Sequence, residues 1–177
     1  MYTERHNRVL HRIADLVRRS GKYADWTVLV DEPVEMFGEH LGKLANQRPD
    51  LTLIAPDKSM ILALEVSVVY ADSRRDTMGE PERVKLHRYD NWIARLLEHE
   101  AVSHARVLPI TVASQGIVPH NVGDTLLKPG LGSSRYIRRA CRWMAIDILH
   151  DSFKIFKTYT NSIQLNAERG ASGAASS

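Results

Sequence analysis

Two carboxylates separated by a short turn form the most informative pattern in this sequence. The tripeptide Arg-Pro-Asp ends at Asp50, and fourteen residues separate Asp50 from Glu65. The residues between them predict two strands joined by a turn centred on Asp57 and Lys58. In that register Asp50 lies directly opposite Glu65, with the two Cβ atoms about 4.5–5.5 Å apart on one face. Such a pair can hold one cation, and Mg²⁺ with water and phosphate as its other ligands suits it.

Glu65 lies in a strand that is apolar on both faces, Ile-Leu-Ala-Leu-Glu-Val-Ser-Val-Val-Tyr. Such a strand is central in its sheet, and a buried carboxylate without a partner costs several kcal/mol or becomes protonated. The partner is either a metal ion held jointly with Asp50 or an arginine that makes Glu65 a structural carboxylate. Arg48 and the arginines of the first predicted helix are the candidates for the second interpretation.

The elements that must position these residues follow from periodicity and turn signals. Residues 34–47 are ambiguous, and residues 71–79 and 114–132 predict loops. Helices are predicted at 3–20, at 81–100 and in a long segment after Gly132, and strands at 26–30, 51–55, 61–70 and 106–113. Pro109 indicates that the last strand is an edge strand or contains a bulge. The order predicts an α/β domain with a mixed β-sheet flanked by helices.

Length and composition predict one domain with a short appendage. The chain has 177 residues, 44% of them hydrophobic and 25% charged, which fits one globular core. The domain is expected to span residues 1–162. Nine of the last eleven residues are Gly, Ala or Ser, so 163–177 is expected to be a flexible polar tail.

Several classes of protein are excluded by what the sequence lacks. No apolar run approaches the roughly 18 residues that cross a bilayer. The charged N-terminal residues do not form a secretory signal, so an intracellular protein that is not secreted is expected. A single cysteine, Cys141, forms no internal disulfide. Since no two histidines lie three or four positions apart, structural zinc is not expected either.

Charge is unevenly distributed along the chain. Residues 31–65 carry 3 basic and 7 acidic groups, whereas residues 106–142 carry 6 basic groups and 1 acidic group. Within the long helix, four arginines lie along one face: Arg135, Arg138, Arg139 and Arg142. This face is either a contact surface for DNA phosphates or a solvated helix face.

The pattern of Arg-Pro-Asp, a hairpin and a glutamate in an apolar strand resembles the PD-(D/E)XK superfamily of restriction-endonuclease-like domains. That superfamily usually has a lysine two residues after the acidic one, where this chain has Ser67. In the restriction-like endonuclease domain of site-specific non-LTR retrotransposons, the lysine lies instead on the following helix in a Lys-x-x-Lys-Tyr pattern. This sequence has Lys85 and Tyr89 at matching positions, with Arg88 in place of the second lysine.

Other segments resemble the same domain, so that the resemblance covers roughly residues 3–162. They are Arg5-His6-Asn7, Glu32-Pro33, Val107–Ala113 followed by Gly116, and Arg138-Arg139-Ala-Cys-Arg142. Each motif is short, and their order and spacing carry the resemblance. The chain contains neither a reverse-transcriptase motif nor a zinc knuckle.

The resemblance implies a restriction-endonuclease-like fold and a nuclear, Mg²⁺-dependent DNA endonuclease, with Mn²⁺ as a possible substitute. Asp50 and Glu65 would bind the metal, and Lys85 would orient water or stabilise charge on the phosphate. The product would be a nick in target DNA whose free 3′-OH primes reverse transcription. DNA is then the substrate, and the reverse-transcriptase region of the same polyprotein is a partner.

Other residues receive a subsidiary role in this hypothesis. Arg48 and the four arginines of the long helix would contact DNA, and His6, Ser67 and Tyr89 are accessory positions. For three of the site residues the sequence leaves an alternative role open. Lys85 could be a surface lysine, Tyr89 a core residue and His6 a capping or surface residue.

Two other functions remain open from the sequence. Ser67 at the usual lysine position favours a catalytically inactive nucleic-acid-binding module with the same fold. A stand-alone repair or junction nuclease would share the carboxylates. The enzyme and the binding module differ in one observable feature, which is whether the nitrogen of Lys85 reaches the Asp50–Glu65 pair.

Overall fold

The computed structural model describes residues 2–72 and 76–174. Within these residues the chain forms five α-helices, three short 3₁₀ helices and four strands. In chain order they are α1 (Tyr2–Arg19), η1 (Gly21–Tyr23), β1 (Thr27–Val30), η2 (Glu35–Phe37), α2 (Gly38–Leu41), η3 (Gly42–Leu44), β2 (Leu51–Ile54), β3 (Met60–Val69), α3 (Gly79–Leu97), β4 (His104–Ala113), α4 (His120–Leu127) and α5 (Ser134–Ala174). The predicted α/β class, with a mixed sheet flanked by helices, is confirmed.

The four strands form one sheet in the order β1-β2-β3-β4. β1, β2 and β3 are antiparallel neighbours, whereas β4 runs parallel to β3 and is reached through the crossover helix α3. Pro109 lies in β4 at the edge of the sheet, as predicted, because an edge strand tolerates a missing backbone N–H. β3 is central, as the apolar pattern around Glu65 predicted.

The predicted hairpin register is also confirmed. Leu51 pairs with Leu64, and Ile54 pairs with Ile61. Lys58 adopts a φ of 63° in the connecting turn, and its N–H donates to the carbonyl of Ala55. This register places Asp50, the residue before β2, across from Glu65.

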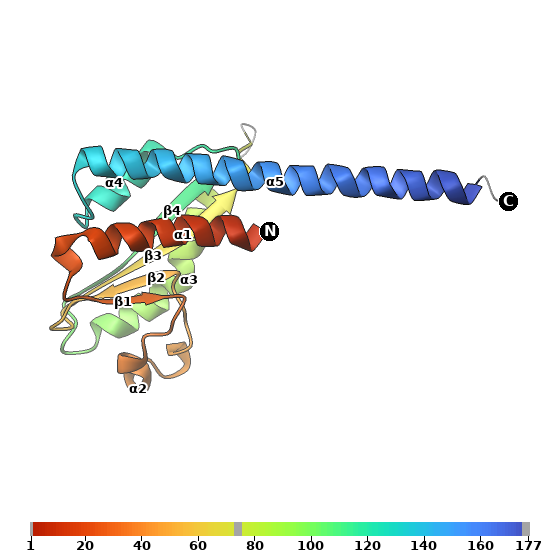
Figure 1. Ribbon diagram of the computed structural model, residues 1–177. Coiled ribbons are helices and arrows are strands. Elements are labelled where there is room, and N and C mark those ends of the chain that lie inside the picture. Colours follow the sequence, from red (N-terminus) through yellow and green to blue (C-terminus); the bar gives the residue numbers. More distant parts are fainter. Residues whose placement is uncertain (1, 73–75, 175–177) are drawn as a thin grey trace.

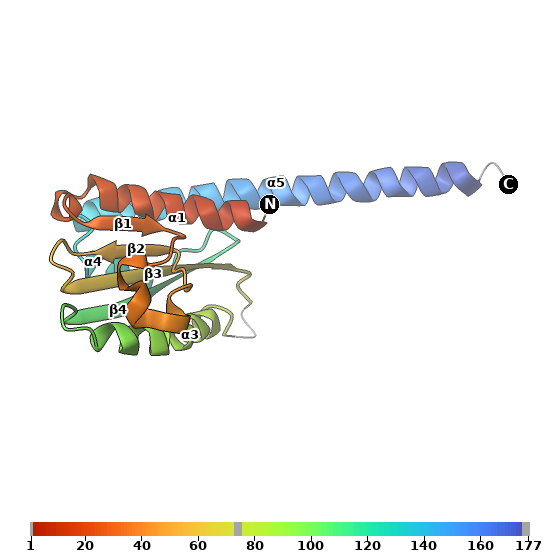
Figure 2. The same cartoon turned by 90° about the horizontal axis from the view of Figure 1, so that it is seen from below.

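Helices cover both faces of the sheet (Figures 1 and 2). α1, α4 and α5 pack on one face and α3 on the other, next to the segment that contains η2, α2 and η3. Side chains therefore form two hydrophobic clusters, one on each face. Alternation along β3 divides its residues between them: Leu62, Leu64 and Val66 face α1 and α5, and Ile61 and Ala63 face α3.

Two segments between the predicted elements contain helices. The loop predicted at 114–132 contains α4, which begins directly after Pro119. Val122 and Leu126, four residues apart on one face of this helix, are buried. The ambiguous segment 34–47 forms three short helical turns that bury Val34, Phe37 and Leu41. Part of the Arg-rich loop predicted at 71–79 lies outside the described residues.

The long C-terminal helix extends further than expected. A flexible polar tail was predicted at 163–177, whereas α5 continues to Ala174. The run Gln-Leu-Asn-Ala-Glu-Arg at 164–169 contains good helix formers, and extending an existing helix adds a hydrogen bond for each residue fixed. The C-terminal part of α5 projects beyond the domain in both views (Figures 1 and 2).

Candidate active site

The β2–β3 hairpin brings Asp50 and Glu65 together. The backbone N–H of Asp50 donates to Glu65 Oε1 at 3.0 Å, and the N–H of Val66 donates to Asp50 Oδ2 at 2.7 Å. Each carboxylate is therefore held by a backbone group of the opposite strand. These reciprocal bonds fix both side chains at the end of the hairpin without using their remaining lone pairs.

Glu65 is almost fully buried, with 1% of its side chain exposed. Its neighbour on β4 is Pro109, which has no backbone N–H. The N–H of Asp50 does not neutralise the charge of this buried carboxylate. A cationic partner from outside the sheet is therefore needed. It points to the face that α3 covers.

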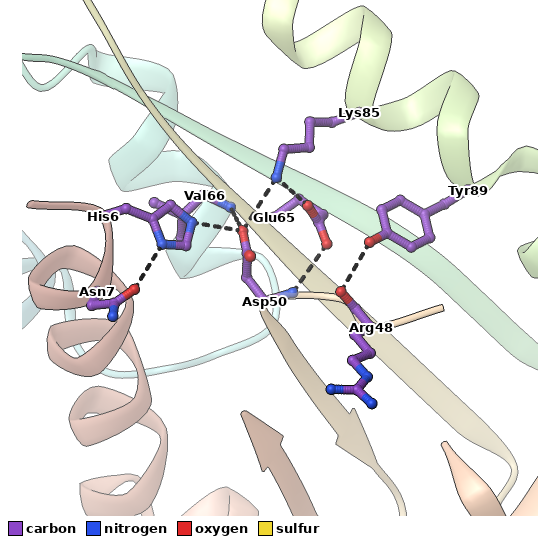
Figure 3. Close-up of polar contacts among 8 residues, drawn as sticks. All are labelled: His6, Asn7, Arg48, Asp50, Glu65, Val66, Lys85 and Tyr89. Carbon is purple, nitrogen blue, oxygen red and sulfur yellow. Dashed lines mark hydrogen bonds and ion pairs between the residues drawn. The ribbon is translucent and has the colours of Figure 1, made fainter. Parts of the chain in front are cut away.

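Lys85 of α3 supplies that partner (Figure 3). Its Nζ lies 3.3 Å from Asp50 Oδ2 and donates a hydrogen bond to Glu65 Oε2. The side chain is 23% exposed, so the ammonium group lies at the boundary between the buried glutamate and solvent. One cationic group thus joins both carboxylates, which places Lys85 within the cluster and not on the outer surface of α3.

His6 reaches the same aspartate from α1. Its Nε2 lies 3.1 Å from Asp50 Oδ2, and its Nδ1 lies 3.2 Å from Asn7 Oδ1. The hydrogen bond to Asp50 raises the pKa of His6, more than burial lowers it. His6 is therefore part of the cluster, and its ring is oriented by contacts on both nitrogens.

The environment keeps Asp50 ionised. Burial by itself would raise the pKa of this carboxyl group, but the hydrogen bond from His6, the charge of Lys85 and the N–H of Val66 together lower it below its usual value. An ionised aspartate is the form that binds cations. The four side chains of His6, Asp50, Glu65 and Lys85 are called the ionic cluster below.

Tyr89 supports the cluster from the core. It lies one helical turn after Lys85, has 1% exposure and packs edge-on against Trp92. Its hydroxyl donates to the carbonyl oxygen of Arg48 at 3.2 Å. Burial raises the pKa of the Tyr89 hydroxyl, and the negative charge of Glu65 adds to this effect. Tyr89 is thus a core residue that also fixes the backbone just before Asp50.

Three other predicted positions contribute less directly. Arg48 offers its carbonyl to Tyr89, while its guanidinium points away from the ionic cluster (Figure 3). Arg88 is exposed and lies against the ring of Tyr89, 5.4 Å from its centroid. Ser67 lies on β3 opposite Thr111, and no hydrogen bond joins its hydroxyl to the cluster. Because Lys85 is the cationic partner of Glu65 and the guanidinium of Arg48 points elsewhere, the interpretation of Glu65 as paired with Arg48 is wrong.

On the side of His6 and Asp50, the cluster borders a cavity of about 410 Å³ beside the start of α1, which Glu65 and Lys85 do not line. Asp50 and His6 line it together with Thr3, Asn7 and Asp31. The sequence analysis did not identify Asp31, whose φ of 52° and backbone bond to the Asp50 carbonyl fix the turn after β1. The only available signal was an aspartate directly after a strand, a common turn residue.

The four arginines predicted to bind DNA lie together at the start of α5, and all are exposed. They line one groove with Trp143 and Ile146. A second groove, between α1 and α5, combines Arg139 with Arg12 and Arg19 of α1. Arg12 and Arg19 are 6 and 13 residues after His6 on α1, which is about 9–20 Å along the helix axis. The basic surface is thus separate from the cluster but lies on the same side of the sheet as α1.

The oxygen atoms of the cluster suit a hard divalent cation. Asp50 Oδ2 and Glu65 Oε2 already share one cationic group, and Asp50 Oδ1 has no partner among the described residues. No group of three or more His, Cys, Asp or Glu side chains in the described part of the chain is arranged to hold a metal. Mg²⁺ does not require one, because it commonly takes one or two carboxylates and fills its remaining positions with water and phosphate.

Comparison with known proteins supplies no relative. Neither a protein-family model nor a curated protein matches this sequence. The described helices include none that is long and apolar enough to span a membrane. Functional inference therefore rests on the residues of the cluster and on their geometry.

Proposed function

We propose that this chain is a Mg²⁺-dependent DNA endonuclease that nicks its target by phosphodiester hydrolysis. The observation that carries the proposal is the contact of Lys85 Nζ with both Asp50 and Glu65. An acidic pair next to a lysine suits metal-dependent phosphodiester hydrolysis, since it offers ligands for a cation and a positive charge for the phosphate. In this chain the lysine comes from α3. The family that the sequence resembles also has its lysine on the helix that follows the strand, in the Lys-x-x-Lys-Tyr pattern.

The proposed roles follow from the position of each group. Asp50 and Glu65 would hold the metal, which when bound supplies Lewis-acid activation of water and charge neutralisation on the phosphate. Lys85 would move from the carboxylates toward a phosphate oxygen and stabilise the negative charge that develops there. His6 keeps Asp50 oriented and ionised through its hydrogen bond.

The substrate is proposed to be DNA because the start of α5 offers clustered positive charge. Arg135, Arg138, Arg139 and Arg142 would contact phosphates and position the duplex without reading its sequence. Arg12 and Arg19 extend this surface along α1 toward the cluster.

The biological setting is proposed from the resemblance to the endonuclease domain of site-specific non-LTR retrotransposons. The nick would leave a 3′-OH that primes reverse transcription, with the reverse-transcriptase region of the same polyprotein as a partner and the nucleus as the compartment. A repair or junction nuclease would use the same cluster on a different substrate, so the comparison of intact duplex with branched DNA separates these settings.

Conversion of supercoiled plasmid to the nicked form tests the proposal. The wild-type chain should nick in Mg²⁺ or Mn²⁺ and not in excess chelator. Asp50→Asn, which keeps the size of the side chain, should abolish nicking, whereas Lys43→Met on the exposed surface serves as a matched control and should not. Ligation of the nick by a DNA ligase would identify 5′-phosphate and 3′-OH ends.

A catalytically inactive binding module predicts a different result. In that case the wild-type chain would bind DNA and leave plasmid intact in both metals, and the ionic cluster would be a structural ion-pair network. Nicking that Asp50→Asn leaves unchanged would mean that a contaminant or another site is responsible.

A further inference from the structure

The outer face of α5 carries apolar side chains that its own domain leaves at least half exposed. Ile146, Leu149, Phe153, Phe156 and Ile163 are each at least half exposed. They follow the spacing 3, 4, 3 and 7, which is the a and d pattern of a heptad repeat with Thr160 in the one remaining a position. These six residues, 146, 149, 153, 156, 160 and 163, are called the α5 seam below.

The seam faces away from the domain. Ile137, Ala140, Met144 and Ile148 mark the side of α5 that is buried against α1 and α4. At about 100° per residue, Ile146 lies about 200° around the helix from Met144. Ion pairs hold the domain side in place: Arg8 Nε lies 2.9 Å from Asp151 Oδ2, and Arg12 Nε lies 3.2 Å from Asp147 Oδ2. The apolar members of the seam therefore stay at least half exposed when α5 is seated on α1, and Leu149 also lies against Gly116 in the loop after β4.

Beyond the domain, α5 has no other described element beside it. Both views show the helix projecting alone (Figures 1 and 2). Phe153, Phe156 and Tyr159 are 65%, 62% and 64% exposed. A single helix with large aromatic side chains in water is unfavourable unless another surface covers them, because each aromatic side chain can bury about 150–250 Å².

We propose that the α5 seam pairs with the same seam of a second copy of this chain, in a parallel two-stranded coiled coil. A heptad period is the pattern that keeps one stripe facing another helix along its length, whereas a groove in a globular partner needs only a few anchors. The apolar side chains of the seam, each at least half exposed, extend over residues 146–163. This is about 27 Å of helix, which is long enough to bury a continuous stripe.

The available area suits such a dimer. Phe153 and Phe156 of the seam, with Tyr159 at the flanking g position, together offer about 300–450 Å² of surface per copy, and a standard interface buries about 800 Å² per partner. The three aliphatic members of the seam, each 50–52% exposed, supply much of the remainder. Apolar area on this scale exceeds what isolated surface residues normally contribute.

Charges next to the seam favour the parallel orientation. Lys157 occupies an e position, and in a parallel pair it faces the g position of the partner, which is the uncharged Ser152. In an antiparallel pair the e positions of the two copies face each other. Lys157 would then lie next to Lys157 or His150 of the partner copy, which is unfavourable for its charge. The parallel pair also aligns Thr160 with its own copy, so that a polar residue occurs at the same level in both helices.

The proposal is independent of the nuclease function, but it has a consequence for the basic surface. Arg135, Arg138 and Arg142 precede the seam on the same face of α5. A parallel pair would therefore bring two sets of arginines to one end of the coiled coil. A basic segment followed by a dimerising heptad stripe on one helix is a geometry that holds two copies on one DNA duplex.

Sedimentation equilibrium of the full chain without DNA tests the pairing. The wild type should be a dimer in the micromolar range, and Phe153→Glu combined with Phe156→Glu should be a monomer with an unchanged circular dichroism spectrum of the folded domain. Lys154→Glu, outside the seam, is the matched control and should remain dimeric. A wild-type monomer at all these concentrations would overturn the proposal, as would a dimer that survives the double substitution.

Disulfide trapping tests the orientation and does not depend on the double variant. In a Cys141→Ser background, Thr160→Cys should form an intermolecular disulfide under mild oxidation, whereas Lys154→Cys should not. A dimer without the Thr160→Cys cross-link would overturn the parallel arrangement.

A monomer that instead sediments with anionic lipid vesicles would assign the apolar face of α5 to a membrane surface and overturn the pairing.

Discussion

Lys85 joins the two carboxylates of the cluster: its Nζ lies 3.3 Å from Asp50 Oδ2 and donates to Glu65 Oε2. The lysine comes from a crossover helix and not from the strand that carries Glu65. On that strand this chain has Ser67 at the position where the superfamily that the sequence resembles usually has a lysine. The contact also changes the expected stability of variants. Removal of Lys85 would leave a buried carboxylate without a cation, which is more costly than loss of a surface lysine.

Metal binding should therefore stabilise a Lys85→Met variant more than the wild type. If the cluster binds Mg²⁺ as proposed, the ion should stabilise the folded chain by mass action, about 2.7 kcal/mol at a hundredfold excess over Kd. In the wild type the cation must compete with the ammonium group of Lys85, whereas in Lys85→Met it replaces the missing charge. Thermal unfolding followed with and without Mg²⁺ measures both shifts. Asp50→Asn and Glu65→Gln should lose the shift, and an unchanged shift in both would exclude this metal site.

The His6–Asp50 pair should make stability depend on pH in a defined direction. The pKa of His6 is raised in the folded chain, so its contribution is complete below the ordinary histidine pKa of about 6.5 and is lost as the pH rises through the raised value. The pKa of Asp50 is lowered, so its contribution is present above its ordinary value and is lost as the pH falls through the lowered one.

Substitution of His6 separates the two contributions. His6→Gln should lower the free energy of unfolding most at about pH 5–6, with a smaller difference from wild type at about pH 9, because the imidazolium charge is then absent in both chains. Urea denaturation at the two pH values measures this difference. His11→Gln, on an exposed part of α1, is the control and should show no such dependence on pH. An equal loss at both pH values would mean that the charge of His6 is not involved.

The basic start of α5 should control DNA affinity through its charge interactions with phosphates. Replacement of Arg135, Arg138 and Arg142 by Gln should weaken binding and reduce the slope of log K against log salt by about 0.9 for each phosphate that is no longer neutralised, without a change in sequence preference. Fluorescence anisotropy over a range of salt concentrations provides the slope. A slope equal to that of the wild type would make this surface a solvated helix face.

The prediction of the fold was most successful where contacts are local. The hairpin register followed from the turn at Asp57 and Lys58, and it correctly placed Asp50 opposite Glu65. Sequence alone left the position of Lys85 open, because its reach depends on how α3 crosses the sheet between β3 and β4. The contact of His6 with Asp50 is also a tertiary result, since 43 residues lie between them.

Two features of the fold depended on packing that local patterns do not show. α4 was missed because Gly123 and the nearby prolines favour a loop, whereas Val122 and Leu126 gain burial against α5 and β4. α5 was expected to end near Ile163 because the last residues are small and polar. The heptad spacing from Ile146 to Ile163 was present in the sequence but was obscured by the buried stripe of Ile137, Met144 and Ile148 on the same helix.

Ser67 provides a test of the lysine position. Residues 65 and 67 point to the same face of β3, so a lysine at 67 would extend toward the side on which α3 packs. Ser67→Lys in a Lys85→Ala chain should recover part of the nicking rate and part of the stability that Lys85 provides. Ser103→Lys, at an exposed position beside the β2–β3 turn and so at the other end of the sheet from Asp50 and Glu65, should recover neither. If the two double variants nick equally slowly, then position 67 cannot supply the charge in this fold.

The nicking rate of Lys85→Met tests the central claim most directly. The assay should be single-turnover, in saturating Mg²⁺, at a temperature at which circular dichroism shows the variant to be folded, with DNA affinity measured on the same sample. The rate should fall about 100-fold or more, because one preorganised charge-stabilising donor is worth about 2.7–4 kcal/mol, while DNA affinity stays near that of the wild type. A folded Lys85→Met chain that nicks DNA as fast as the wild type would contradict the assignment of this cluster as a nuclease site.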